Sequence, residues 1–331
     1  MKKPLIAAAL ILTIFLTACS VTTPAATVPG TTGSALTDIR LPVGYIPNVQ
    51  FAPLYVAIDK GFYSDEGLNV HIDYSMENDN AVLLGNDSVQ FAILSGEQVM
   101  LGRGQQLPLV YVMAWYQQYP VGVASKVAEG ITQPADLAHK RIGLPGTFGA
   151  SYIGLIALLD SAGLSEQDVS LDSIGFNQVE ALTANKDDAV VIYSANEPEA
   201  LKKQGVDVNV LKVSDYSPLV ANGLVTNEKT LAANPELVQK MVRATLKGID
   251  YVIAHPDESF ELCKKYVENL ANADQELQKK VLLNSIEQWK ADRPGLTDPA
   301  SWENMQRILL KMKLLKEPLD LTKAYTNEFI P

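Results

Sequence analysis

The chain has few of the residues that usually carry catalysis or metal binding. It contains two cysteines, Cys19 and Cys263, and three histidines, His71, His139 and His255, in 331 residues. The histidines are scattered and form no His-Glu-x-x-His pair, so the ligand spacing of a zinc hydrolase is absent. No Gly-x-Ser-x-Gly nucleophile elbow is present either. The sequence therefore supports no catalytic residues, no metal site and no cofactor.

Basic charge and long apolar runs are also limited. Lys and Arg number 27 against 38 Asp and Glu, which gives a formal net charge of −11. Such an acidic surface disfavours nucleic acid and anionic lipid as partners. After the N-terminal segment, no apolar run reaches transmembrane length. The hydrophobic fraction of 47% is that of a globular protein with a sizeable core, and the length suits two domains.

The N-terminus reads as an export signal. Lys2 and Lys3 precede an apolar run over 5–16, and Leu16-Thr17-Ala18-Cys19 resembles a bacterial lipobox. This motif implies a signal peptide over 1–18, cleavage before Cys19, and lipidation of Cys19, with an ordinary secretory signal as the alternative. Residues 19–37, rich in Thr, Ala, Pro, Gly and Ser, predict a flexible tether. We therefore expect a protein held in the cell membrane by its lipid and facing the extracytoplasmic side. With Cys19 lipidated no disulfide can form, and Cys263 is expected in the core.

From residue 38, short apolar runs alternate with amphipathic helical patterns. Strands are predicted at 41–43, 70–72, 89–94, 107–115, 121–124, 141–144, 169–174 and 189–193. The pattern changes after 223–226, and the chain from 228 onward is nearly all helical. This alternation predicts an α/β fold with mostly parallel sheets. We expect one lobe from 38–116 plus 222–331 and a second from 117–221. A hinge would join them, an interlobe cleft would lie between them, and the helical C-terminal segment would pack on the first lobe.

Four segments carry a resemblance to one family. They are 44–70, which begins Gly-Tyr-Ile-Pro-Asn-Val-Gln-Phe, and 90–97, 142–147 and 234–238. These segments are similar to the extracytoplasmic solute-binding proteins of ABC importers, in the group related to pyrimidine-precursor synthases and to sulfonate and taurine binders. The resemblance implies a two-lobed periplasmic-binding-protein-like fold, and a permease with its ATPase as partners. The Cys-rich segment of the synthases has no counterpart here, which argues against the enzymatic alternative.

Candidate ligand-binding residues follow the predicted strands, where α/β lobes usually meet ligands. Each turn also has a plain structural interpretation as a helix cap or as core. The 146–151 turn lacks the lysine of a P-loop, so nucleotide hydrolysis is not expected. The candidates are Tyr45, Asn48, Gln50, Phe51, Glu97, Trp115, Tyr116, Thr147, Phe148, Ser151, Tyr193, Asn196 and Glu197.

The aromatic rings among these candidates favour a flat heteroaromatic ligand. Arg103 and Arg141 lie away from the predicted cleft, so the forked cation expected of a sulfonate or phosphate binder is missing. Vitamin-binding members of the family have a similar opening segment, which implies a flavin such as riboflavin. A thiamine pyrimidine precursor, an aliphatic sulfonate, and an adhesive or sensory role without a permease stay as alternatives. We expect a monomer that closes around its ligand and makes or breaks no bond.

Overall fold

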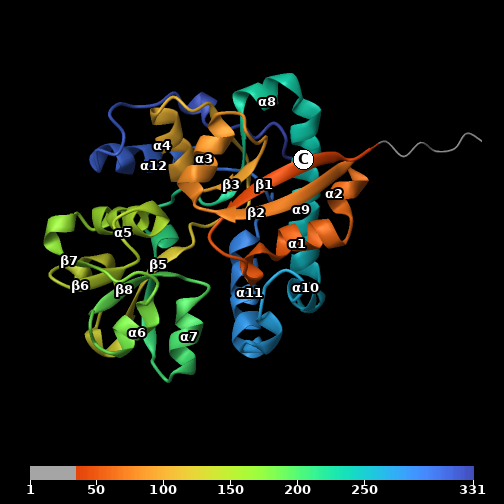
Figure 1. The fold of residues 1–331 in the computed structure, drawn as a ribbon. Coiled ribbons are helices and arrows are strands. Elements are labelled where there is room, and N and C mark those ends of the chain that lie inside the picture. Colours follow the sequence, from red (N-terminus) through yellow and green to blue (C-terminus); the bar gives the residue numbers. More distant parts are fainter. Residues whose placement is uncertain (1–34) are drawn as a thin grey trace, which may run out of the picture. The chain divides into compact units, whose positions relative to one another are not determined.

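Two five-stranded sheets form the framework of the chain (Figure 1). The structure, a computed structural model, describes residues 35–331. The predicted signal peptide (1–18), Cys19 and nearly all of the predicted tether lie outside the described residues. The first strand already begins at Thr37, the last residue assigned to the tether.

The first sheet has the strand order β2-β1-β3-β10-β4. Its strands are β1 (Thr37–Gly44), β2 (Leu68–Ser75), β3 (Ala92–Leu94), β4 (Leu109–Ala114) and β10 (Gly223–Asn227). β1 runs parallel to β2, from Thr37 opposite Leu68 to Gly44 opposite Ser75, and parallel to β3. β10 runs antiparallel to both β3 and β4. We call this sheet and the helices on it the first lobe.

The second sheet has the order β7-β6-β8-β5-β9. Its strands are β5 (Val121–Lys126), β6 (Arg141–Leu144), β7 (Ser170–Ser173), β8 (Ala189–Tyr193) and β9 (Val208–Lys212). β6 is parallel to β7 and β8, whereas β5 is antiparallel to β8 and β9. We call this sheet and its helices the second lobe. The prediction of an α/β fold with two lobes is confirmed, while the residue boundaries of the lobes stay a prediction.

The expectation of mostly parallel sheets is wrong, because half of the strand pairings are antiparallel. Every antiparallel pairing involves β5 or β10. The chain enters the second sheet at β5 and returns to the first sheet at β10. Burial on both faces suggested parallel pairing for β4, and all six of its residues are indeed buried. However, an apolar run indicates that a strand is buried, and it does not show whether the strand runs parallel or antiparallel to its neighbours. β9 was not predicted, since it is a half-buried edge strand with a weak apolar pattern.

Helices fill the connections and the C-terminal part. They are α1 (Ala52–Asp59), α2 (Phe62–Asp65), α3 (Glu77–Gly85), α4 (Gly96–Gly104), α5 (Gly149–Ser161), α6 (Gln178–Thr183), α7 (Glu197–Lys203), α8 (Glu228–Ala233), α9 (Pro235–Ala254), α10 (Pro256–Cys263), α11 (Gln275–Trp289) and α12 (Pro299–Lys311). Short 3-10 turns are η1 (Val49–Phe51), η2 (Val127–Glu129), η3 (Pro134–Leu137), η4 (Glu166–Asp168), η5 (Val213–Asp215), η6 (Leu270–Asn272) and η7 (Leu321–Lys323). The predicted helical C-terminal segment is thus confirmed. In the part of the chain that the structure describes, no helix is both long and apolar enough to cross a bilayer.

Alternating side chains of β8 pack on opposite faces of the second sheet. Ala189 and Val191 belong to the large core, while Val190 and Ile192 pack with α6 and α7 side chains in a smaller one. In the first lobe, α1 packs on α9, and a side chain at Gly248 would come within 2.4 Å of the Pro53 carbonyl oxygen. Cys263 is buried and free, as predicted from its helical position.

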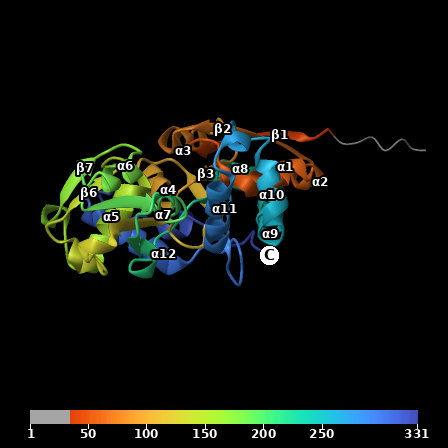
Figure 2. The same cartoon turned by 90° about the horizontal axis from the view of Figure 1, so that it is seen from below.

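The C-terminal helices touch both lobes, which the sequence did not predict (Figures 1 and 2). Asn284 of α11 donates to the Glu199 carboxylate of α7 at 3.2 Å. Arg307 of α12 donates to the Asp160 carboxylate of α5 at 2.6 Å. The C-terminal segment therefore packs on the first lobe and also holds the second.

Candidate functional site

The turn after β1 presents polar groups at the carboxyl end of the first sheet. Asn48 is the N-cap of η1, and its Oδ1 accepts from the Gln50 amide at 2.7 Å, while its Nδ2 donates to the Ile46 carbonyl at 3.1 Å. Tyr45 precedes this turn with a φ of 76°, a left-handed conformation that is uncommon for tyrosine. The Tyr45 side chain is half exposed and is not a lid over the core.

A cavity of about 230 Å³ lies between this turn and the second lobe. The first-lobe side contributes the turn after β1 and three residues of α11. The second-lobe side contributes α6 and the start of α7. The lining residues are Tyr45, Ile46, Asn48, Gln50, Val179, Asn196, Glu197, Ala200, Leu277, Gln278 and Val281.

Hydrogen bonds join the two sides of the cavity. Asn196 Nδ2 donates to Gln50 Oε1 at 3.2 Å, and Gln50 Nε2 donates to the Tyr116 hydroxyl at 3.4 Å. Gln288 Nε2 donates to Ser194 Oγ at 2.9 Å. Polar side chains of both lobes therefore meet here, as expected of a site that closes around a ligand.

Glu197 is the acidic residue among those lining the cavity. Its Oε2 accepts from the Tyr193 amide at 2.9 Å. Burial raises the pKa of Glu197 to about 7, against two backbone hydrogen bonds that lower it. Burial, and next the charge of Glu197, raise the pKa of Tyr45, and both side chains line the cavity.

Two further carboxyl groups lie in the first lobe at the ends of β2 and β3. Glu77 opens α3, and its carboxylate accepts from the Ser95 amide (3.1 Å), the Ser95 hydroxyl (2.9 Å) and Asn222 Nδ2 (2.8 Å). These bonds connect the end of β2 and the end of β3 to the segment that leads into β10. Burial raises the pKa of Glu77 to about 7.

Glu97 in the first turn of α4 is fully buried. Within residues 35–331, neither of its carboxylate oxygens has a hydrogen-bond partner. Burial, and next the charge of Glu77, raise the pKa of Glu97 to about 8. A buried acceptor without a partner is costly unless it is protonated or met by a ligand.

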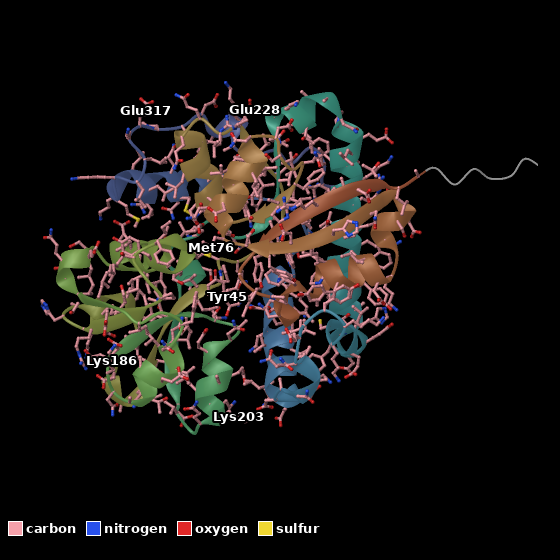
Figure 3. The ribbon with its side chains drawn as sticks, in the orientation of Figure 1. Tyr45, Met76, Lys186, Lys203, Glu228 and Glu317 are labelled. Carbon is pink, nitrogen blue, oxygen red and sulfur yellow. The ribbon has the colours of Figure 1, made fainter. Side chains whose placement is uncertain are left out.

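Exposed apolar side chains from both lobes stand at strand ends around this region. Tyr45 and Phe176 contact each other, with ring centroids 5.8 Å apart and planes tilted by 58°. Figure 3 shows Tyr45 and Met76 where the ribbons of the two lobes approach one another. We call five residues that are 51–71% exposed the rim: Tyr45, Ile46, Met76, Phe148 and Phe176. The exposed contact between Tyr45 and Phe176, one ring from each lobe, is of a kind found at binding surfaces.

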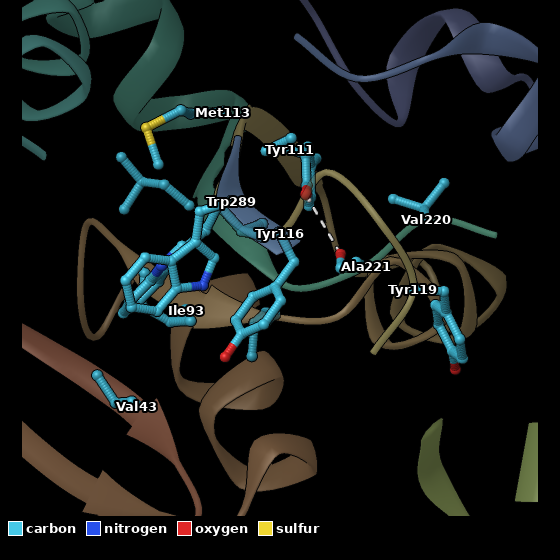
Figure 4. Close-up of a cluster of buried hydrophobic side chains, with 14 of the residues drawn as sticks. Val43, Ile93, Tyr111, Met113, Tyr116, Tyr119, Val220, Ala221 and Trp289 are labelled. Atoms are coloured by element: carbon cyan, nitrogen blue, oxygen red, sulfur yellow. Dashed lines mark hydrogen bonds between the residues drawn. The ribbon is translucent and has the colours of Figure 1, made fainter. Parts of the chain in front are cut away.

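The other predicted aromatic residues pack in the core behind the cavity. Trp115 is 1% exposed and its ring contacts those of Phe51, Tyr116 and Trp289 at 5.9 to 6.2 Å. Figure 4 shows Tyr116 beside Trp289, and their ring centroids lie 6.0 Å apart at 85°. Among the described residues, the indole nitrogens of Trp115 and Trp289 have no hydrogen-bond partner. These rings support the site from behind rather than line it.

The turn before α5 stands apart from the cavity lining. Thr147 is exposed, Ser151 is buried, and Phe148 is the N-cap of α5 and projects as part of the rim. The predicted residues that the structure brings to the cavity are Tyr45, Asn48, Gln50, Asn196 and Glu197. Those outside its lining are Phe51, Glu97, Trp115, Tyr116, Thr147, Phe148, Ser151 and Tyr193.

Sequence reasoning missed several residues of this region. Glu77 and Met76 follow the strand predicted at 70–72, and Phe176 follows the strand predicted at 169–174, so the same strand-end rule could have found them. Nothing local marks Leu277, Gln278 and Val281 of α11, since only the packing of that helix brings them to the cavity.

The lining chemistry suits an uncharged polar ligand. Amide groups of Asn48, Gln50, Asn196 and Gln278 offer donors and acceptors beside apolar side chains. Arg103 donates hydrogen bonds to the Leu109 carbonyl and the Glu228 carboxylate, and Arg141 donates to the Asp188 carboxylate. Each arginine is therefore held within its own lobe. In the described range, no three His, Cys, Asp or Glu side chains are grouped to hold a metal ion.

The family model described as NMT1/THI5 like matches residues 48–259. The riboflavin-binding protein RibY of Chloroflexus aurantiacus is 38% identical over 100% of this chain and 99% of its own length. The formylaminopyrimidine-binding protein of Halalkalibacterium halodurans is 27% identical over 99% of each. A 4-amino-5-hydroxymethyl-2-methylpyrimidine phosphate synthase of Legionella pneumophila is 23% identical over 88% of this chain and 92% of its own.

Solved structures share the fold. The periplasmic aliphatic sulphonate binding protein SsuA of Escherichia coli superposes with a TM-score of 0.71 at 14% sequence identity. The match covers 87% of this chain and 97% of that protein. At this identity the likeness concerns the two-lobed fold alone, and it agrees with the arrangement of the two sheets.

Proposed function

This chain belongs to the NMT1/THI5-like family, and from that premise we propose that it is the extracytoplasmic substrate-binding protein of an ABC importer. It captures a small molecule between its lobes and delivers it unchanged to a permease with an ATPase. The observation that carries this proposal is the cavity itself, which takes its lining from both lobes. Two relatives named for binding a small molecule support the same role.

Riboflavin or a close flavin is the proposed ligand. A riboflavin-binding relative matches the whole chain at 38% identity. The rim offers the rings of Tyr45, Phe148 and Phe176 for stacking on a flat ring system, where an aromatic pair contributes roughly 0.5–1.5 kcal/mol beyond burial. The amides of the lining suit the hydroxyl groups of the ribityl chain.

Flavin binding requires the lobes to separate and then close. The cavity of about 230 Å³ is smaller than the roughly 300–1,000 Å³ usual for pockets that hold drug-sized ligands. A three-ring ligand would therefore enter while the Gln50–Asn196 bond is open, and the bond would form again as the lobes close. Closure over the ligand shifts the population toward a shape that the permease can recognise.

A pyrimidine precursor is the second candidate, because a formylaminopyrimidine-binding relative also matches nearly the whole chain. Its single ring suits the small cavity. A sulfonate is disfavoured, since the cavity lining holds no lysine or arginine. The synthase relatives leave an enzyme as the alternative from a different functional class. An enzyme would convert the bound compound, whereas a binding protein would release its ligand unchanged.

Titration of purified protein with riboflavin tests the ligand. Stacking should quench flavin emission at a 1:1 ratio, and calorimetry should show heat of binding. Phe176→Ala and Tyr45→Ala should weaken binding by about tenfold, while the exposed Leu314 in the turn after α12 provides a control, Leu314→Ala. Tight binding of hydroxymethylpyrimidine or formylaminopyrimidine with no response to riboflavin would select the second candidate.

The lipid anchor is proposed from the lipobox alone, since Cys19 lies outside the described residues. Cys19→Ser should move the protein from the membrane fraction to the soluble fraction and abolish labelling by a palmitate analogue. Cys263→Ser is the matched control, because Cys263 is buried in α10 and cannot accept lipid in the folded protein. Membrane retention of the Cys19 variant would contradict the anchor.

A further inference from the structure

Helix α11 presents one face to the second lobe along its whole length, and Figure 1 shows it beside α7. The residues of this face recur every three or four positions, which is the spacing of one side of an α-helix. Each of them bonds a second-lobe residue or lines the cavity. They are Asp274 at the N-cap, Gln278, Val281, Asn284 and Gln288.

The partners of this face on α7 follow in the reverse order. Asp274 pairs with Lys203, the last residue of α7, and Asn284 donates to the Glu199 carboxylate at 3.2 Å. The two helices therefore run antiparallel along their contact. Ala200 lies between the two partners on α7 and lines the cavity, so this contact flanks the cavity. We call the two contacts, Lys203–Asp274 and Asn284–Glu199, the α7–α11 pairs.

The C-terminal end of α11 is attached to a segment where the chain crosses between the lobes. Gln288 Nε2 donates to Ser194 Oγ at 2.9 Å, and the Ser194 hydroxyl donates to the Pro120 carbonyl at 2.9 Å. The Gln117 amide donates to the Gln288 carbonyl at 2.9 Å. Gln117 and Pro120 lie between β4 and β5, where the chain passes from the first sheet to the second. This end of the contact therefore lies at the hinge.

The other end of the contact is an ion pair far from that crossing segment. Asp274 and Gln288 are separated by about 21 Å along the helix axis, since each residue rises about 1.5 Å. The Lys203 side chain is 60% exposed and that of Asp274 is 28% exposed. As the N-cap, Asp274 also accepts from the Leu277 amide at 3.1 Å, and Leu277 is the first α11 residue of the cavity lining. The ion pair thus attaches α7 to the turn of α11 where the lining begins.

We propose that the α7–α11 pairs are formed by positioning residues that slow the release of the bound ligand. These residues lie outside the cavity lining, and they act by holding the α11 side of the cavity against α7 once the lobes have closed. The inference rests on the proposed function and deepens it. Because α7 must separate from α11 before the ligand leaves, contacts that form after entry affect the dissociation rate and not the association rate.

The contact between α12 and α5 also joins the lobes, but it lies beside the other crossing segment. Asn304 of α12 donates to the Ser217 hydroxyl at 2.9 Å and to the Pro218 carbonyl at 2.8 Å, between β9 and β10. Arg307 donates to Asp160 of α5 at 2.6 Å. Among the described residues, the cavity takes none of its lining from α5 or α12. We therefore expect this contact to persist when the lobes open, which makes Asp160→Asn a matched control.

The release of riboflavin from the full-length protein tests the proposal, measured by stopped-flow recovery of flavin emission after dilution. Lys203→Met and Asp274→Asn should each raise the dissociation rate about 2- to 5-fold, the range expected for an exposed ion pair. Asn284→Ala should raise it about 2- to 10-fold, the range for one hydrogen bond. Association rates should stay unaltered. Asp274→Asn keeps a side-chain N-cap, so its urea midpoint should stay near that of wild type, whereas Asp160→Asn should lower the midpoint without changing the dissociation rate.

The salt dependence of release is a readout that a purely structural role would not alter. The Lys203–Asp274 pair is partly exposed, so added salt screens it. We expect the wild-type dissociation rate to increase between about 0.02 M and about 0.5 M NaCl, and this increase to be smaller in Lys203→Met. Asp160→Asn should keep the wild-type salt dependence.

The outcomes separate this inference from the proposed function. Wild-type dissociation rates in Lys203→Met, Asp274→Asn and Asn284→Ala would overturn the inference and leave a flavin-binding protein. If neither riboflavin nor hydroxymethylpyrimidine binds, the proposed ligand is wrong, and X-ray scattering of the ligand-free protein then decides. The combined Lys203→Met and Asn284→Ala variant should have a larger radius of gyration than wild type, because its lobes separate more readily. An unchanged radius of gyration would contradict the role of the α7–α11 pairs.

Discussion

Asn196 donates a hydrogen bond from Nδ2 to Gln50 Oε1 at 3.2 Å, and this bond joins two residues 146 positions apart. Gln50 is buried in the turn after β1, and Asn196 precedes α7 in the second lobe. The Gln50 amide also donates to Tyr116, so it is held from the first lobe while it receives Asn196 from the second. The distance between these two side chains therefore reports whether the lobes are closed.

Removing one partner of this bond should weaken ligand binding modestly. For Asn196→Ala we expect a Kd for riboflavin about 2- to 10-fold higher, because one net hydrogen bond contributes roughly 0.5–1.5 kcal/mol. Gln50→Ala and the double variant complete a thermodynamic cycle, measured by flavin quenching. Coupling above about 0.5 kcal/mol supports a shared closing contact. Simple additivity of the two changes would show that the residues act separately.

Gly96 should not tolerate a side chain. A Cβ at this position would lie 2.3 Å from Val220 Cβ and 2.9 Å from the Val220 carbonyl oxygen, in the segment that leads back to the first sheet. Gly96→Ala should lower the free energy of unfolding by about 1–3 kcal/mol through overpacking, as measured by urea denaturation. Val220→Ala on the same chain removes the contact with Val220 Cγ1 at 2.5 Å but keeps the one with Cβ, so it should restore only a small part of the loss. An unchanged urea midpoint for Gly96→Ala would show that this segment is free to move.

Stability should fall as the pH rises from about 5 to 8. Burial raises the pKa of Glu97 to about 8 and those of Glu77 and Glu197 each to about 7, from 4.5. The folded state then binds more protons than the unfolded chain across this range, so increasing pH favours unfolding. The slope is at most about 1.4 kcal/mol per pH unit for each titrating carboxyl.

Urea midpoints at pH 5, 6, 7, 8 and 9 measure this dependence. Glu97→Gln should flatten the profile, and its stability relative to wild type should increase with pH. The control Glu276→Gln removes an exposed carboxylate that pairs with Lys280, and it should leave the slope in this range unaltered. A urea midpoint of the wild-type protein that increases between pH 5 and 8 would contradict this prediction.

Asp160 should be the most important ion-pair residue between the lobes. Its carboxylate, only 12% exposed, pairs with Arg307 at 2.6 Å and with Lys311, so it attaches α5 to α12. Asp160→Asn should cost about 1–3 kcal/mol of unfolding free energy, because two cations lose their partner at a largely buried oxygen. Glu276→Gln, which breaks an exposed pair within α11, should cost less than about 0.5 kcal/mol. Thermal denaturation at low and high salt compares them, and equal losses would show that the Asp160 contact adds nothing.

Local sequence patterns placed most strands and the residues that follow them. Arg141–Leu144 and Ala189–Tyr193 were predicted with their observed bounds, because a buried strand needs a continuous apolar run between polar turns. The same reasoning put Asn48 and Asn196 at strand ends, where they do reach the cavity. It did not separate Trp115, which packs in the core, from Tyr45, which is exposed, since both are aromatic residues next to a strand.

The sequence by itself determined the α/β class, the helical C-terminal part, the acidic character and the family, because these depend on composition and on short-range patterns. Only the tertiary structure decided the antiparallel directions of β5 and β10, the approach of α11 to the cavity and the hydrogen bond between Asn196 and Gln50. These features join segments far apart in the chain. Their arrangement depends on how the sheets and helices of residues 35–331 fill space together, and no local sequence pattern determines that.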